Sequence, residues 1–254
     1  KEQVGPILGE LEYKKINLNL TQNMEKLAAV FETIKLIKKQ NHEKDLIGFC
    51  GGPFTVLNYM IERGTSKTHK KIIKYIKTQK EESKQLIELI TDVSIEYLKN
   101  QIDSGVDFIK VFDSWAGLLD GDEYTKYVIE PNKKIAQQIY KYSPKTKQIF
   151  FPRGSKQNYL SFIKVVKPDV IALDEKFPVE VFSYAKKHNI TLQGNLPPKL
   201  LIEGGIKLRE GIKKILNKFE GNKHIFNLSH GVLPQTPIKN VEILVEEIRN
   251  YNET

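Results

Sequence analysis

One histidine on a tight turn, His230, is the side chain in this sequence with the clearest capacity for chemistry. It stands between Ser229 and Gly231, directly after the β-like run 224–228, and two prolines follow before a helical pattern resumes. An imidazole there could carry a proton near neutral pH or donate a hydrogen bond to a substrate carboxylate. A histidine that only caps the turn is the alternative, and position alone leaves both roles open.

Two polar residues, Asp113 and Ser114, follow the apolar run 108–112 and precede a helical pattern. Either could be the N-cap of that helix or could contact a ligand. Ser114 lacks the G-x-S-x-G elbow of a hydrolase nucleophile, so no Ser-His-acid triad is predicted. We expect Trp115, the only tryptophan, to pack against this loop.

Other residues at the ends of apolar runs are weaker candidates. The glycine pair 51–52 would let backbone approach a ligand closely. Arg153 could clamp a carboxylate bidentately or could lie on the surface, and for Asp174 we expect turn capping. Tyr59 lies six residues into a helical pattern, where a tyrosine usually packs in the core.

The other four histidines are weaker candidates than His230. Three of them lie among lysines in surface-like segments, and the last opens a β-like run at the end opposite to a site: His42, His69, His188 and His224.

The elements that must position these residues alternate regularly along the chain. Short β-branched and aromatic runs are each followed by one or more helical patterns, which indicates about six strand–helix units and a parallel sheet. Two architectures stay open, a doubly wound sheet and an eight-fold barrel that lacks its first two units. No G-x-G-x-x-G follows the first run, which weakens a dinucleotide-binding fold. In both architectures ligands bind where strands end at their carboxyl edge. The predicted strands span 45–49, 108–112, 148–151, 169–173, 190–194 and 224–228.

Composition narrows the class of protein. The chain has 254 residues and a net charge of +9, most of it from lysines in helical stretches that read as solvated faces. No nucleic-acid-binding motif, no secretory signal and no stretch of roughly 18 apolar residues is found, so neither a nucleic-acid partner nor a membrane is expected. One cysteine, Cys50, excludes an internal disulfide and a multi-cysteine metal cluster. We expect a cytoplasmic location.

Four segments, in the right order, resemble the uroporphyrinogen decarboxylase family. They are GFCGGPFTVLNYMIERGTSK (48–67), VFDSWAGLL (111–119), LQGNLPPKLL (192–201) and HIFNLSHGVLPQTP (224–237). The last departs from the family pattern at Ser229 and Gln235. The resemblance covers nearly the whole chain.

This resemblance implies a single (β/α)8 barrel domain, here 1–254, in a homodimer without cofactor or metal. It implies conversion of uroporphyrinogen to coproporphyrinogen, in which four acetate side chains lose their carboxylates. A pyrrole ring carbon is protonated and becomes an electron sink, carbon dioxide leaves, and the exocyclic carbon is reprotonated. By motif position Tyr59, Ser114 and His230 match substrate-binding residues, and Phe112 matches a phenylalanine beside the pyrrole rings.

Departures from the family pattern concern the chemistry itself. The family places an arginine-rich RQAGRY segment after its first strand and an aspartate in an FSDIL-like segment after its second, and neither segment is present. The resemblance therefore implies an N-terminally truncated member with about six of eight units, whose catalytic groups are not assigned in this chain. LDEKFP (173–178) and the loop 62–64 also depart from the family, which affects loop contacts only.

Two other functions compete with this interpretation. Methyltransferases on the same barrel, which act on corrinoids or thiols, need zinc held by His and Cys, and the lone Cys50 argues against them. A non-catalytic tetrapyrrole-binding fragment would fit the two missing segments. A lysine-driven nucleic-acid binder is a more distant third, because the lysines carry no binding motif.

We predict that the 254-residue polypeptide by itself does not decarboxylate uroporphyrinogen. An opened barrel exposes strand edges, and the family's arginine and aspartate segments are absent from it. A direct assay of carbon dioxide release by this polypeptide tests the expectation, and measurable turnover would overturn it.

Overall fold

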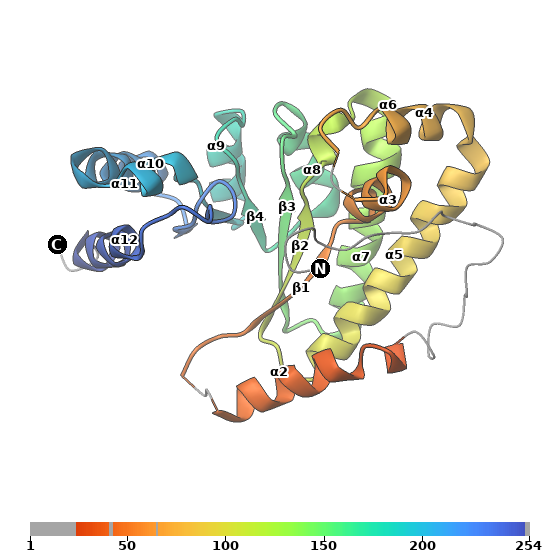
Figure 1. Cartoon of the computed structure of the whole chain (residues 1–254), viewed down its shortest axis with the longest axis horizontal. Coiled ribbons are helices and arrows are strands. Elements are labelled where there is room, and N and C mark those ends of the chain that lie inside the picture. Colours follow the sequence, from red (N-terminus) through yellow and green to blue (C-terminus); the bar gives the residue numbers. More distant parts are fainter. Residues whose placement is uncertain (1–23, 41–42, 65, 252–254) are drawn as a thin grey trace.

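A single parallel sheet organises the chain, as seen in a computed structural model that describes residues 24–40, 43–64 and 66–251 (Figure 1). Every strand that the sequence predicted is present, with ends shifted by a few residues, and each pairs in parallel with its neighbours. The strands of this described part are β1 (Ile47–Gly51), β2 (Phe108–Asp113), β3 (Lys147–Pro152), β4 (Val170–Ala172), β5 (Thr191–Gln193) and β6 (His224–Ile225).

The order of the strands in space decides between the two architectures. From β1 to β6 the strands lie side by side in the order in which they occur in the chain. A doubly wound sheet would reverse this order at a switch point, whereas a barrel does not. The doubly wound alternative is therefore wrong, and the α/β class with barrel-type winding is confirmed. The total of eight units stays a prediction.

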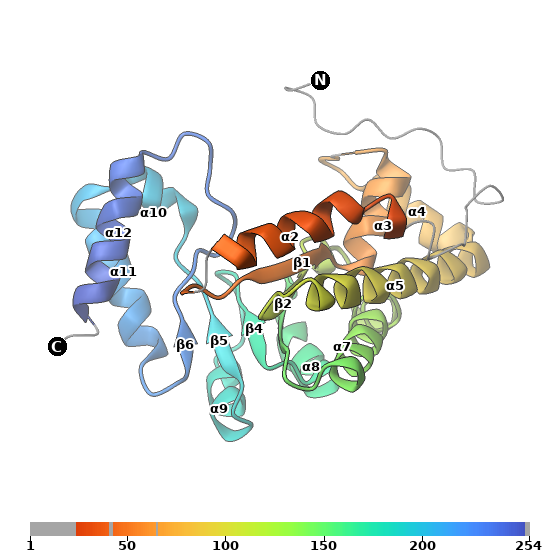
Figure 2. The ribbon, with the colours of Figure 1, turned by 90° about the horizontal axis from the view of Figure 1, so that it is seen from below.

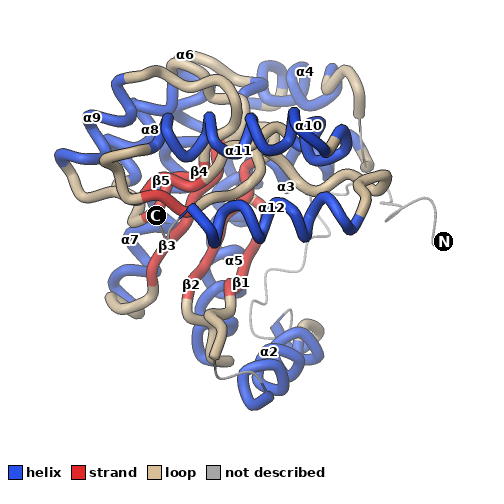
Figure 3. Tube along the Cα trace, turned by 90° about the vertical axis from the view of Figure 1, so that its left-hand side faces the viewer, coloured by secondary structure: helices blue, strands red, loops and turns tan. Residues whose placement is uncertain are grey.

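Helices follow the strands and pack along the sheet, as Figures 2 and 3 show from two directions. The longest, α5, has apolar side chains at three- and four-residue spacing facing the core, and Glu81 and Glu82 favour its positive N-terminal end. Within the described residues no helix is long and apolar enough to cross a membrane. The helices are α2 (Ala28–Gln40), α3 (Pro53–Glu62), α4 (Lys70–Thr78), α5 (Lys80–Asp103), α6 (Gly121–Tyr124), α7 (Glu130–Tyr142), α8 (Asn158–Val166), α9 (Glu180–Lys187), α10 (Pro198–Glu203), α11 (Gly205–Phe219) and α12 (Ile238–Tyr251), with a π-helical turn at Thr125–Ile129 between α6 and α7.

The two faces of the sheet differ in character. The face toward the helices belongs to the main hydrophobic core, with Val111, Phe150 and Leu192 fully buried. The opposite face carries a smaller apolar cluster at Ile149, Phe151, Val170 and Ala172, against which Phe108 and Phe112 pack. This second face is the inner face of a barrel-type sheet.

A lysine, Lys110, is buried on the inner face. Its Nζ donates a hydrogen bond of 2.6 Å to Oε1 of Gln193, which lies on β5. The same ammonium group lies 4.7 Å from the centre of the Phe112 ring, a cation–π contact. Burial lowers the pKa of Lys110 to about 8, because a charged amine loses solvation there.

Two glycines bring the loops after β2 and β3 into direct contact. The Gly117 amide donates a 3.0 Å hydrogen bond to the carbonyl of Arg153. A Cβ on Gly117 would lie 2.2 Å from the carbonyl oxygen of Gly154. Only glycine at 117 lets these two loops pack together.

We predict that Gly117→Ala destabilises the fold, since the added methyl group meets backbone that cannot swing away as a side chain can. The expected loss in the free energy of unfolding is about 1 to 3 kcal/mol, measured by urea denaturation. Gly231→Ala is the matched control, because a Cβ there meets no atom within 4 Å. Equal losses in both variants would contradict the proposed close packing.

Candidate active site

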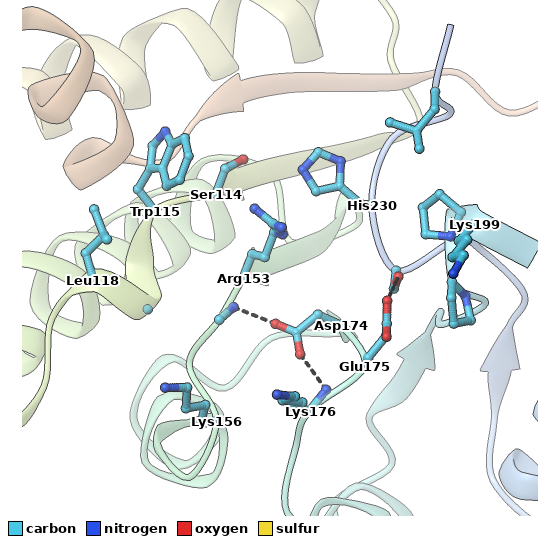
Figure 4. Close-up of a pocket in the computed structure, with 16 residues that line it drawn as sticks. Ser114, Trp115, Leu118, Arg153, Lys156, Asp174, Glu175, Lys176, Lys199 and His230 are labelled. Atoms are coloured by element: carbon cyan, nitrogen blue, oxygen red, sulfur yellow. Dashed lines mark hydrogen bonds between the residues drawn. The ribbon is translucent and has the colours of Figure 1, made fainter. Parts of the chain in front are cut away.

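One cavity of about 730 Å³ opens at the carboxyl edge of the sheet (Figure 4). The loops after β2, β3, β4, β5 and β6 all contribute to its wall, as the position of ligand sites in barrel-type sheets predicts. Two of the four residues matched to substrate binding, Ser114 and His230, line it. The other lining residues are Trp115, Gly117, Leu118, Arg153, Gly154, Lys156, Asp174, Glu175, Lys176, Pro197, Pro198, Lys199, Ser229 and Leu233.

His230 is prepared to donate a hydrogen bond. The Gly231 amide donates to its Nδ1 at 2.6 Å, so the neutral ring carries its proton on Nε2. Partial burial lowers the pKa of His230, and the nearby positive charge of Arg153 lowers it further. Figure 4 shows the Arg153 side chain extending from the opposite wall toward this imidazole. The result is a neutral histidine with one free N–H beside an arginine.

The loop that carries Ser114 is held by the buried carboxylate of Asp113. Its Oδ1 accepts hydrogen bonds from the amide (3.1 Å) and the hydroxyl (2.7 Å) of Thr55. Its Oδ2 accepts one from Nδ2 of Asn132 at 3.0 Å. The Thr55 hydroxyl oxygen in turn accepts a hydrogen bond from the Trp115 amide at 3.1 Å. The backbone on both sides of Ser114 is thus tied to α3.

This network corrects two expectations from the sequence. Asp113 does not cap the helix that follows it; it accepts the Thr55 amide in the first turn of α3, a helix 58 residues earlier in the chain. Gly52 does not admit a ligand, because the space beside it is filled by Asp113, whose Cβ would lie 2.4 Å from an added Cβ. Pro53 occupies the first turn of α3.

A third correction concerns His69, which the sequence places on the surface. Its side chain is 5% exposed, its Nδ1 lies 3.0 Å from Oδ1 of Asn58, and its ring lies 4.1 Å from that of Trp115. The prediction that Trp115 packs against the loop is confirmed, and His69 is one of its packing partners. Among the other histidines, His188 is exposed and His224 lies at the start of β6, while His42 falls outside the described residues.

Tyr59 and Phe112 do not line the cavity. Tyr59 is half-buried in α3. Phe112 lies on the inner face, where its ring meets those of Phe49 and Phe151 edge-on at 5.9 and 6.4 Å. Their substrate roles stay predictions.

The acidic residues of the cavity wall are engaged by the protein itself. The Asp174 carboxylate accepts hydrogen bonds from the amides of Gly154 and Lys176, which confirms its expected turn-capping role. Oε1 of Glu175 accepts the hydroxyl of Ser229 at 3.1 Å. These contacts link the loops after β3, β4 and β6.

Sequence reasoning did not identify Thr55 and Asn132 as supports of the site. Both look like ordinary helix residues, and Asp113 is 58 residues from the first and 19 from the second. Only the assembled fold brings the three together. The glycine at position 52 was the one local signal, since a residue with a side chain could not stand there.

The described residues offer no metal site of the kind that histidine, cysteine and carboxylate side chains form. No group of three or more His, Cys, Asp or Glu side chains within the described part of the chain could hold a metal ion. Burial raises the pKa of the Cys50 thiol to about 12. This thiol therefore stays protonated, which is the wrong state for a zinc ligand.

The chain is similar in sequence to proteins of one family. The family model described as uroporphyrinogen decarboxylase (URO-D) matches residues 2–251. The chain is 41% identical over 253 residues to a uroporphyrinogen decarboxylase of Rickettsia bellii, which covers 99% of this chain and 74% of that protein. It is 40% identical over 258 residues to the protein of the same name from Rickettsia massiliae, and this match covers 100% of this chain and 73% of that protein.

Solved structures resemble the chain in fold. A methyltransferase from Methanosarcina mazei superposes with a TM-score of 0.69 at 19% identity, over 89% of this chain and 65% of that one. A B12-independent methionine synthase from Shewanella superposes with a TM-score of 0.59 at 16% identity, over 87% of this chain and 67% of that one. At these identities the likeness concerns the fold alone.

We predict that Asp113 gives stability a distinct dependence on pH. Burial raises the pKa of its carboxyl from 3.8 to about 6, although hydrogen bonds from Thr55 and Asn132 oppose this. The folded protein therefore takes up a proton at higher pH than the unfolded chain, so this contribution to stability is present at low pH and is lost as pH rises through about 6.

The test compares urea unfolding of the natural protein and of Asp113→Asn at several pH values. We expect the advantage of aspartate over asparagine to grow by roughly 1 to 2 kcal/mol between pH 7 and 4.5. Asp122→Asn, at an exposed position, is the control and should show no such growth. If the free energies of unfolding of the natural protein and of Asp113→Asn differed by the same amount at every pH, the raised pKa of Asp113 would be refuted.

Proposed function

The chain belongs to the uroporphyrinogen decarboxylase family, and on that premise we propose that it is a carboxy-lyase of porphyrin and haem biosynthesis. It removes carbon dioxide from the four acetate side chains of uroporphyrinogen and yields coproporphyrinogen. The observation that carries the proposal is a family match over residues 2–251. Ser114 and His230, the two matched residues in the cavity wall, support it.

Polar groups in the cavity suit a substrate rich in carboxylates. The neutral imidazole of His230 offers one N–H, the hydroxyl of Ser114 offers one O–H, and the guanidinium of Arg153 offers a planar pair of donors. All three groups line the same cavity. Donors preorganised in this way bind an anion with little rearrangement of the protein.

In the reaction that the family resemblance implies, electrons flow from the carboxylate into the ring. A pyrrole carbon takes up a proton, the bond between the carboxylate and its methylene carbon breaks, and the electron pair of that bond neutralises the ring. The exocyclic carbon then takes up a proton to become a methyl group, and the ring carbon releases its own. The role of the cavity in this scheme is to bind and orient the acetate arms.

The proton donor is not assigned to a residue of this chain. The resemblance places that chemistry in RQAGRY-like and FSDIL-like segments, which residues 1–254 do not contain. Asp113 is not a substitute, since its two oxygens accept hydrogen bonds from Thr55 and Asn132. It positions the Ser114 loop instead.

We further propose that Tyr59 and Phe112 contact the substrate, as motif position implies. We also propose that residues 1–254 act as one barrel domain, that the protein forms a homodimer, and that it is cytoplasmic. These proposals rest on the family resemblance. The aromatic inner face around Phe112 supports contact with the planar pyrrole rings of the substrate, because three phenylalanine rings gather there.

The methyltransferase alternative is disfavoured by the residues that the chain offers. The single cysteine of this chain, Cys50, is buried, and burial raises the pKa of its thiol to about 12. The solved methyltransferase shares the fold at 19% identity, which is no argument for a shared reaction. A non-catalytic tetrapyrrole-binding protein differs from the proposal in turnover alone.

The decisive experiment incubates uroporphyrinogen under reducing conditions with a longer protein that contains this sequence, and not with the 254-residue polypeptide by itself. We expect release of carbon dioxide and accumulation of coproporphyrinogen. Binding of the tetrapyrrole without release of carbon dioxide would favour the non-catalytic alternative.

His230 provides the sharpest test of the site. We predict that His230→Ala raises KM for uroporphyrinogen roughly tenfold, the scale of one hydrogen bond to a charged group. The side chain is exposed and, among the residues that the structure describes, is hydrogen-bonded to its neighbour Gly231 alone, so the free energy of unfolding should change by less than about 1 kcal/mol. His188→Ala, at the exposed end of α9, is the control. Unchanged kinetics for His230→Ala would remove this residue from the site.

A further inference from the structure

Cationic side chains surround one side of the cavity in a regular way. Arg153 and Lys156 follow β3, Lys176 follows β4, and Lys199 follows β5, and all four line the cavity. Figure 4 shows them on successive loops around the opening. We call these four residues the basic rim.

Most of the basic rim forms no ion pair with the residues that the structure describes. Among the ion pairs that the described residues form, one involves the rim, between Lys199 and Glu203 at 3.7 Å on the surface. The acids of the cavity wall are engaged elsewhere, because Asp174 accepts two backbone amides and Glu175 accepts the Ser229 hydroxyl. Lys156 lies close enough to Asp120 to lower the pKa of that carboxyl, but it forms no ion pair with it among the described residues. Arg153, Lys156 and Lys176 therefore line the cavity without a counter-ion bound to them in the described part of the chain.

We propose that the basic rim sets specificity by responding to the number of carboxylates around the edge of the substrate. This inference rests on the proposed function, and it assigns roles to Lys156 and Lys176 in addition to Arg153. Uroporphyrinogen carries eight carboxylates at the periphery of its ring, and each decarboxylation removes one. Cations spread over three adjacent loops meet such a periphery at several points. Affinity thus falls stepwise as the reaction proceeds, which favours retention of early intermediates and release of the product with four carboxylates.

The dependence of ligand binding on ionic strength gives an independent test of the basic rim. Exposed cations act on an anion through a field that salt screens over about 8 to 10 Å. Binding that depends on the rim weakens as salt is added, and more so for eight carboxylates than for four. Hydrogen bonds inside the cavity, from Ser114 and His230, are affected less.

The test uses the double variant Lys156→Gln/Lys176→Gln, because both lysines are exposed and their replacement should leave the fold intact. The matched control is Lys141→Gln/Lys187→Gln. These two lysines are also exposed, and they lie at the C-terminal ends of α7 and α9. In a βα unit that end adjoins the amino edge of the sheet, opposite to the cavity. Both variants lower the net charge by two.

Two readouts are made on the whole protein, with thermal unfolding as a check of the fold. The first is the dissociation constant of uroporphyrin, the oxidised fluorescent form with all eight carboxylates, and of coproporphyrin with four, across a series of salt concentrations. The second is KM and kcat for uroporphyrinogen. For the rim variant we expect Kd and KM to rise roughly two- to tenfold at low salt, with a shallower salt dependence, a smaller preference for uroporphyrin and little change in kcat.

Failure of the two proposals is distinguishable. If the natural protein releases carbon dioxide but the rim variant matches the control in Kd, KM and salt dependence, the basic rim is refuted and the proposed function stands. If uroporphyrin binding depends on the rim but no carbon dioxide is released, the proposed function is refuted instead. A rim variant that loses kcat at unchanged KM would also overturn a role in specificity.

Discussion

The candidate site depends above all on one buried carboxylate. Asp113 joins the end of β2, the first turn of α3 and the side of α7 through three hydrogen bonds. A buried carboxylate is costly unless its oxygens are satisfied, so the three elements must approach within hydrogen-bond distance or the fold loses stability. Gly52 is the corollary, since its missing side chain leaves room for Asp113. The position of Ser114, one residue further along the chain, follows from this constraint.

The loops after β3, β4 and β6 are linked one after another to the loop that Asp113 holds in place. Gly117 joins the loop of Ser114 to the loop of Arg153. Asp174 joins the latter to the turn after β4, and Glu175 reaches Ser229 beside His230. Side chains at the cavity mouth are thus held by short contacts between neighbouring loops. The acids take part in these links, while the cations of the basic rim line the cavity.

The features that follow from local pattern were predicted from the sequence, and those that depend on distant pairing were not. Runs of β-branched and aromatic residues located every strand, and the carboxyl-edge rule located Ser114, Arg153 and His230 in one cavity wall. Burial of His69 was missed because its neighbours in sequence are lysines, while its actual surroundings are Asn58 and Trp115. The role of Thr55 was missed for the same reason: its partner is 58 residues away, and hydropathy does not encode such a pairing. The sequence was also compatible with two orders of the strands in the sheet, and only the observed strand pairing distinguishes them.

The hydrogen bond between Lys110 and Gln193 reports on the shape of the whole sheet. It joins β2 to β5, three strands apart, which is about 14 Å along a sheet with roughly 4.8 Å between strands. Side chains on one face of a flat sheet stand side by side and would not meet over that span. Their contact at 2.6 Å requires the sheet to curl, so that β2 and β5 face each other across its inner side. A sheet curled to this degree directs the loops at its carboxyl edge toward a common centre, and a macrocycle with acids around its edge is the shape of ligand that such a centre can hold from several sides at once.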